Sequence, residues 1–175
     1  MRRLLILRHA KAERAIPGAS DLARSLTKEG REDATRMGEY LVRHHFRPDR
    51  AFISTSARTR ETWDAVSPAL GPGPAANYEP RIYDAKPSTL IDIIKEAPDS
   101  ARSLMLVGHN PGFHELAVLL MATGDVDTRE RLREKFPTCG LAILDFAFEH
   151  WRELHARSGR LERFVTPKTI GSPTN

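Results

Sequence analysis

The sequence LLILRH, at residues 4–9, is a continuous apolar run that ends in two basic residues. This pattern is typical of a strand in a parallel sheet, because helices cover both faces of such a sheet and no polar alternation is needed. We therefore predict a central strand that carries Arg8 and His9 at its carboxyl end. Two further apolar runs, at residues 51–53 and 103–107, predict similar strands.

Segments with helical periodicity alternate with these strands. Residues 27–45 begin with a threonine suited to an N-cap, and their apolar side chains then recur three to four positions apart. Residues 63–70 and 90–97 have the same spacing. Asn110 and Pro111 have the residue types of an N-cap and a first helical position. These segments predict four helices.

The rest of the chain completes a single domain. Residues 71–80 are rich in glycine and proline and predict a surface loop. Residues 141–148 predict a fourth strand and residues 161–165 an edge strand. The alternation of strands and helices favours a three-layer α/β/α sandwich with a mostly parallel central sheet, although it does not give the strand order. The length of 175 residues suits one domain, predicted at 1–166, with a loose tail at 167–175.

The composition narrows the classes of partner. The formal net charge is +4, but the arginines are scattered and do not alternate with aromatic residues, so we expect no nucleic-acid binding. No apolar run is long enough to cross a bilayer, and we expect no membrane partner. The one cysteine, Cys139, has no second cysteine to pair with, which favours a reducing compartment and a cytoplasmic location.

Three of the predicted strands end in related polar groups. The first ends in Arg8 and His9, the second leads through Ser54 to Arg58 in the next helix, and the third ends in His109. Ligands of open α/β sheets bind beyond the carboxyl ends of the strands. If these strands are parallel neighbours, two histidines and two arginines meet at one edge of the sheet.

This set of groups suits a tetrahedral phosphate dianion. Guanidinium groups such as those of Arg8 and Arg58 pair with phosphate oxygens through parallel charge-assisted hydrogen bonds. Zinc would need three histidine, cysteine or carboxylate ligands, and neighbouring arginines would repel it, so we expect neither a metal nor a cofactor. A free ring nitrogen of His9 can attack phosphorus, while His109 hydrogen-bonds to the transferred group.

Four motifs together carry a family resemblance. They are RHAK at residues 8–11, RSLTKEG at 24–30, RTRET at 58–62 and GHNPG at 108–112. In this order and spacing the sequence from residue 3 to about residue 148 resembles the histidine phosphatase superfamily, which includes the cofactor-dependent phosphoglycerate mutases. The short chain, Lys11 and the GHNP motif are similar to its short branch, the bacterial SixA-type phosphohistidine phosphatases.

The resemblance implies a phosphoglycerate mutase-like fold in which His9 accepts the phosphoryl group. Arg8, Arg58 and His109 would complete the phosphate pocket. The glycine that usually follows the nucleophilic histidine is Ala10 here, a residue small enough to fit.

A proton donor is less evident. Larger members of the family have a glutamate in this role, and Asp84 is the candidate here, although it could equally be a loop aspartate or a helix cap. Lys11 and Arg24 are candidates for the rim of the pocket, with solvated surface cations as the alternative.

The lack of a clear proton donor in the sequence favours one class of substrate. An alkoxide leaving group needs a proton, whereas the imidazole of phosphohistidine leaves with much less help. We therefore predict a hydrolase that removes phosphate from phosphohistidine in a signalling protein, such as a phosphotransfer domain. The alternatives are a phosphatase of small phosphate esters and a non-catalytic phosphate-binding module. The oligomeric state is not predicted.

Overall fold

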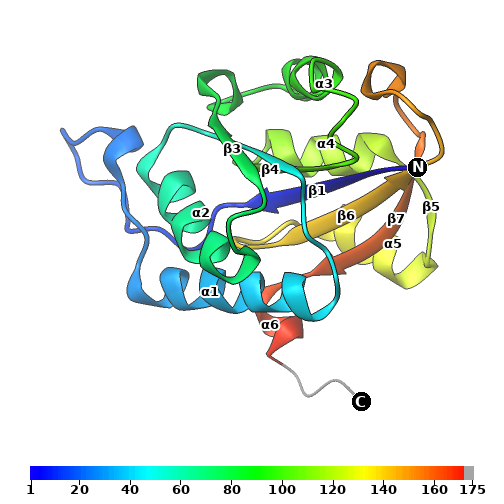
Figure 1. The fold of residues 1–175 in the computed structure, drawn as a ribbon. Coiled ribbons are helices and arrows are strands. Elements are labelled where there is room, and N and C mark those ends of the chain that lie inside the picture. Colours follow the sequence, from blue (N-terminus) through cyan, green and yellow to red (C-terminus); the bar gives the residue numbers. More distant parts are fainter. Residues whose placement is uncertain (172–175) are drawn as a thin grey trace.

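The computed structural model describes residues 1–171, which form one seven-stranded sheet between two layers of helices (Figure 1). The strands are β1 (Arg2–Arg8), β2 (Arg50–Ile53), β3 (Ala75–Tyr78), β4 (Ser103–Gly108), β5 (Met121–Gly124), β6 (Leu141–Phe146) and β7 (Gly159–Val165). Their order across the sheet is β3-β2-β4-β1-β6-β7-β5. Pairing is parallel from β3 to β1 and between β7 and β5, and β6 is antiparallel to both of its neighbours. The predicted α/β/α sandwich with a mostly parallel sheet is confirmed.

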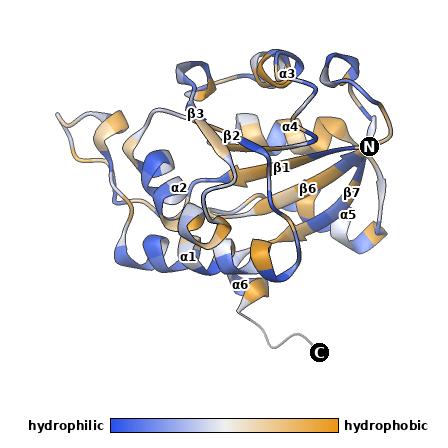
Figure 2. Ribbon diagram, viewed as in Figure 1, coloured by the Kyte–Doolittle hydropathy of each residue, from blue (hydrophilic) through white to orange (hydrophobic). Residues whose placement is uncertain are grey.

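The helices cover both faces of the sheet. One face carries α1 (Lys28–Arg43), α2 (Ala57–Leu70) and α6 (Pro167–Ile170), and the other carries α3 (Pro87–Lys95), α4 (Gly112–Leu120) and α5 (Val126–Glu134). Hydropathy follows these layers, since the central strands are mostly apolar and α1 carries much of the polar surface (Figure 2).

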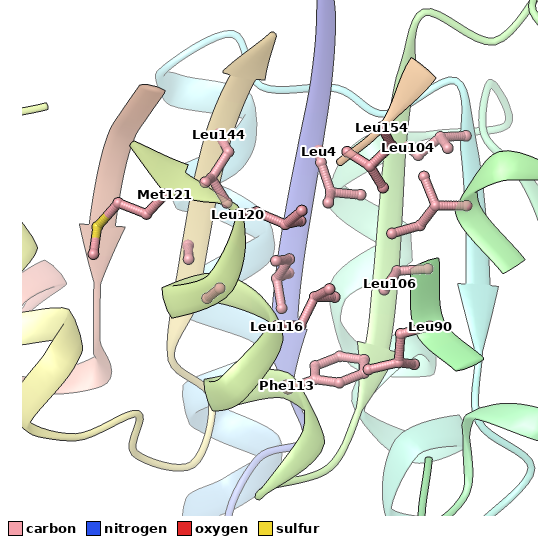
Figure 3. Close-up of a cluster of buried hydrophobic side chains, with 14 of the residues drawn as sticks. Leu4, Leu90, Leu104, Leu106, Phe113, Leu116, Leu120, Met121, Leu144 and Leu154 are labelled. Atoms are coloured by element: carbon pink, nitrogen blue, oxygen red, sulfur yellow. The ribbon is translucent and has the colours of Figure 1, made fainter. Parts of the chain in front are cut away.

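Strand β1 divides its side chains between two cores. Leu4 and Ile6 belong to the core under α3 and α4, where Figure 3 shows Leu4 near Leu120 of α4. Leu5 and Leu7 belong to the core under α1 and α2. All four side chains of the run are fully buried. The continuous apolar run that predicted this strand therefore has a direct physical cause, because each face of the strand is covered by helices.

Three predicted elements differ in the structure. Residues 75–78, predicted as loop, form the edge strand β3. Residues 161–165 lie within β7, which is flanked by β6 and β5 and is not an edge strand. Helix α4 begins at Gly112 rather than at Pro111.

The C-terminal prediction falls partly outside the described residues. The tail predicted to be loose from residue 167 begins with the short helix α6, and residues 172–175 lie beyond the part of the chain that is described. Within residues 1–171 no helix has both the length and the apolar character needed to cross a membrane.

Candidate active site

The carboxyl ends of β1, β2 and β4 lie side by side, as the predicted site requires. Strand β4 lies between the other two and is parallel to both. The ladder continues one step past the strands, because the amide of His9 donates to Gly108 at 2.9 Å and that of Ser54 donates to Val107 at 3.0 Å. The imidazole rings of His9 and His109 consequently lie with their centroids 5.5 Å apart.

His9 is held in a defined tautomer. Its Nδ1 lies 2.7 Å from the carbonyl oxygen of Ala10. Because a carbonyl oxygen only accepts, Nδ1 carries the proton and the lone pair of Nε2 is free. Burial, together with nearby Arg8 and Arg58, lowers the pKa of His9 to about 4. The ring is therefore neutral at neutral pH, with Nε2 available as a nucleophile.

His109 is oriented by the end of the neighbouring strand. Its Nε2 lies 2.7 Å from the hydroxyl oxygen of Ser54, which is fully buried. Burial and the charge of Arg58 lower the pKa of His109 to about 3. When Ser54 donates to Nε2 of the neutral ring, Nδ1 carries the proton.

The two arginines each keep one buried donor unpaired. Arg58, which is 5% exposed, donates from its two Nη atoms to the backbone oxygen of Asp21 at 2.9 Å and to its Oδ2 at 3.1 Å. Arg8 donates to the carbonyl oxygen of Phe136 at 3.1 Å. Nε of Arg8, Nε of Arg58 and Nδ1 of His109 are buried without a partner among residues 1–171. These donors belong to the two arginines whose charge lowers the pKa of His9 and to the neighbouring His109 ring, and they match the hydrogen-bonding needs of a phosphoryl group.

Asn110 does not have the predicted role of a helix N-cap. Its Nδ2 donates to the carbonyl oxygen of Phe136 at 2.8 Å, the same oxygen that accepts from Arg8. The residue thus ties the end of β4 to the segment before β6 and does not cap a helix. Its Oδ1 is a buried acceptor with no partner in the described part of the chain.

Asp21 and Tyr83 belong to this site although no sequence pattern singled them out. The carboxylate of Asp21 accepts from Arg58, from Arg24 at 2.9 Å and from the hydroxyl of Tyr83. These partners, with Tyr83 the largest contributor, lower the pKa of Asp21 to about 2. The Tyr83 ring lies edge-on to His109, with centroids 5.3 Å apart.

The three weaker candidates lie in three different environments. Arg24 reaches the site through its ion pair with Asp21. The Lys11 ammonium instead pairs with Glu29 at 2.9 Å and borders a separate groove of about 390 Å³. Asp84 lines a cavity of about 250 Å³ that also touches His109, but its carboxylate makes no hydrogen bond or ion pair with residues 1–171. Its backbone has a φ of 53°.

Ala10 fits the position where the family usually has glycine. The residue is fully buried in the core under α1 and α2. Its amide donates to the hydroxyl of Thr62 at 3.0 Å, which links the segment after His9 to α2.

Comparison with known proteins agrees with this geometry. Residues 4–86 match the model of the histidine phosphatase superfamily (branch 1). An uncharacterized protein of Mycobacterium tuberculosis is 34% identical over 165 residues, which cover 93% of this chain and 100% of that protein.

Two solved structures are similar over nearly their whole length. The putative phosphohistidine phosphatase SixA from Agrobacterium tumefaciens is 32% identical with a TM-score of 0.78, covering 95% of this chain and 98% of that one. The one from Nakamurella multipartitia is 26% identical with a TM-score of 0.82, covering 95% and 96%. The motifs, the fold and these relatives together show that this chain belongs to the histidine phosphatase superfamily.

Proposed function

We propose that this protein is a phosphohistidine phosphatase that passes the phosphoryl group through His9 to water. The observation that carries the proposal is the combination of a free Nε2 on His9 with three buried donors, on Arg8, Arg58 and His109, that have no partner among residues 1–171. Membership of the superfamily supports phosphatase activity. The similarity to the putative SixA phosphatase of Agrobacterium tumefaciens supports the finer choice of substrate.

The chemistry has two displacements at phosphorus. In the first, Nε2 of His9 forms a bond to phosphorus while the bond to the leaving nitrogen breaks and its electron pair stays on that nitrogen. In the second, water attacks the phosphorylated His9, and phosphate leaves as the imidazole is regenerated. The guanidinium groups of Arg8 and Arg58 neutralise charge on the transferred oxygens in both steps.

The protonation states in the site favour a phosphoramidate substrate. Asp21 is ionised well below neutral pH and cannot give a proton to a leaving alkoxide. The Tyr83 hydroxyl already donates to Asp21. An imidazole leaving group requires no strong acid, so these groups suit phosphohistidine better than an ester.

The proposal includes a protein partner. Asp21 has a side chain 47% exposed, and it lies beside the buried Arg58. A phosphorylated side chain of another protein, such as a phosphotransfer domain of a cytoplasmic signalling system, could enter from this side.

Rapid-quench labelling tests the covalent step. The enzyme is mixed with a protein that carries radiolabelled phosphohistidine, and acid-labile phosphate on the enzyme is counted. We expect label on the wild type and on the control His155→Ala, whose imidazole is exposed and bonds to the backbone of Glu153. We expect none on His9→Ala. Equal labelling of His9→Ala would contradict the proposal.

Two further outcomes identify the alternatives. Faster turnover of sugar or nucleotide phosphates than of the phosphohistidine protein would indicate a phosphatase of small esters. Binding of the phosphorylated protein without any release of phosphate would indicate a non-catalytic binding module.

A further inference from the structure

Asp21 lies at the mouth of the site, while the reacting groups lie at its base. Its side chain is 47% exposed, whereas His9 and His109 are each 7% exposed. Asp21 opens a single 3-10 turn in the loop between β1 and α1. In Figure 1 this loop extends past the carboxyl end of β1. The carboxylate is therefore accessible to an incoming substrate.

The pairing of Arg58 separates the phosphoryl side of the site from the leaving-group side. Both of its Nη atoms donate to Asp21, and its Nε is buried with no partner in the described part of the chain. In the proposed reaction the phosphorus lies over Nε2 of His9, which is buried. Because the attacking and leaving atoms are roughly in line across phosphorus, the leaving group points away from His9. That direction leads to the mouth, where Asp21 lies.

We propose that Asp21 is a specificity-determining residue that accepts a hydrogen bond from the leaving imidazole and so favours phosphohistidine over phosphate esters. This inference rests on the proposed function and names the residue that selects its substrate class.

The charge of Asp21 explains the direction of this preference. The hydrogen bonds from Tyr83 and Arg24, together with Arg58, keep its pKa near 2, so the carboxylate only accepts. A protonated phosphoimidazole offers an N–H on the ring nitrogen that is not bonded to phosphorus. When the phosphorus–nitrogen bond breaks, its electron pair goes to the leaving nitrogen, the other nitrogen keeps its proton, and neutral imidazole departs. A leaving alkoxide gains negative charge, which the neighbouring carboxylate disfavours.

A purely structural role for Asp21 makes a different prediction. If the carboxylate only orients Arg58, its loss weakens phosphoryl transfer from every substrate by the same factor. The ratio of activities on two substrates with different leaving groups therefore separates selection of the leaving group from orientation of Arg58.

The test compares kcat/KM for phosphoimidazole and for p-nitrophenyl phosphate in the wild type, Asp21→Asn and Glu13→Gln. Glu13 is a matched control, because it is an exposed carboxylate of the same loop whose side chain makes no hydrogen bond or ion pair within the described residues. We expect Asp21→Asn to lower the ratio of phosphoimidazole to p-nitrophenyl phosphate activity about tenfold, because the amide oxygen of asparagine is a neutral acceptor and hydrogen bonds to charged groups are the stronger ones. Glu13→Gln keeps the wild-type ratio.

The outcomes separate this inference from the proposed function. If Asp21→Asn loses the same factor on both substrates, the ratio is unchanged and the selective role of Asp21 is overturned, while the proposed function stands. Wild-type enzyme that hydrolyses p-nitrophenyl phosphate but not phosphoimidazole overturns the proposed function itself. Should Asp21→Asn fail to fold, the wild type is tested on phosphoimidazole methylated at the second ring nitrogen. This probe lacks the N–H, and we expect it to have a higher KM than phosphoimidazole; an equal KM overturns the inference.

Discussion

The hydroxyl oxygen of Ser54 lies 2.7 Å from Nε2 of His109 and joins the ends of two neighbouring strands. Ser54 is the residue after β2, and His109 is the residue after β4. Because this contact occupies Nε2, it leaves Nδ1 of His109 as the atom that can meet a ligand. The orientation of an active-site imidazole thus depends on a buried serine that does not touch the reacting atoms.

Replacing Ser54 with alanine should reduce activity without unfolding the protein. The His109 ring loses the partner that sets its orientation and tautomer, and we expect kcat to fall about tenfold, as for the loss of a hydrogen bond. Steady-state kinetics on phosphohistidine protein measures the change. Ser158→Ala is the control, since Ser158 is only half-buried and its hydroxyl donates to the backbone of His155, away from the site. Unchanged kcat in Ser54→Ala would show that the contact is dispensable.

Arg58→Lys should weaken the binding of inorganic phosphate. Lysine keeps the positive charge but has no counterpart of the buried Nε, and it cannot reproduce the paired contacts with Asp21. We expect Kd to rise about tenfold or more by titration calorimetry. Arg60→Lys is the matched control on the same helix, because Arg60 is exposed and bonds to the carbonyl oxygen of Thr55. Equal phosphate affinity in both variants would argue against Arg58 as a phosphate ligand.

The elements that could be predicted are those whose burial requires a pattern of apolar residues in the sequence. The fully buried centres of β1 and β4, residues 4–7 and 104–107, appear as continuous apolar runs. All four residues of β3 are exposed, and its pairing with β2 uses backbone groups, so composition alone indicated a loop. Helix α5 buries only Leu132, which left too weak an apolar pattern to predict it.

In the site, too, the residues that follow apolar strands could be predicted, whereas contacts made by backbone atoms could not. His9 and His109 were found because they directly follow apolar strands, and Arg58 because it opens the helix after one. The carbonyl oxygen of Phe136, which holds Arg8, has no counterpart in a side-chain pattern. Asp21 lies in an irregular loop and reaches Arg58 only through tertiary structure.

Asp84→Asn tests the proton donor predicted from the sequence. The carboxylate of Asp84 makes no hydrogen bond or ion pair with residues 1–171, so we expect activity on p-nitrophenyl phosphate and phosphohistidine to change less than about threefold. Asparagine also tolerates the backbone φ of 53° at this position. A selective loss of ester hydrolysis, measured as kcat, would instead restore Asp84 as the acid.

The two buried imidazoles should make the protein less stable in acid. In the unfolded chain a histidine takes up a proton near its ordinary pKa of 6.5, whereas in the folded protein burial lowers the pKa of His9 to about 4 and that of His109 to about 3. The unfolded state therefore binds more protons as the pH falls below 6.5, and the free energy of unfolding decreases towards pH 4.

His9→Asn isolates the share of one ring in this acid effect. Between about pH 7 and about pH 4.5 the wild type should lose roughly 2 kcal/mol more stability than the variant. Urea denaturation in phosphate-free buffer at both pH values gives the two losses. If they are equal, His9 titrates normally in the folded protein.

Gly30→Ala should damage both stability and activity, although alanine favours helices. Gly30 lies in the first turn of α1, and a Cβ there would be 2.1 Å from the carbonyl oxygen of Lys11. That oxygen also accepts from the amide of Thr27 at 2.9 Å, so α1 packs directly on the backbone that follows His9. We expect a loss of about 2 kcal/mol in the free energy of unfolding, as for other overpacked sites.

The catalytic effect of Gly30→Ala follows from the same contact. Moving Lys11 shifts Ala10, whose carbonyl oxygen sets the tautomer of His9, so kcat should fall along with stability. Gly73→Ala is the control, because a Cβ at Gly73 meets nothing within 4 Å. Denaturation curves and kinetics on the two variants measure both effects. A stable and fully active Gly30→Ala would mean that the backbone after His9 can move without disturbing the nucleophile.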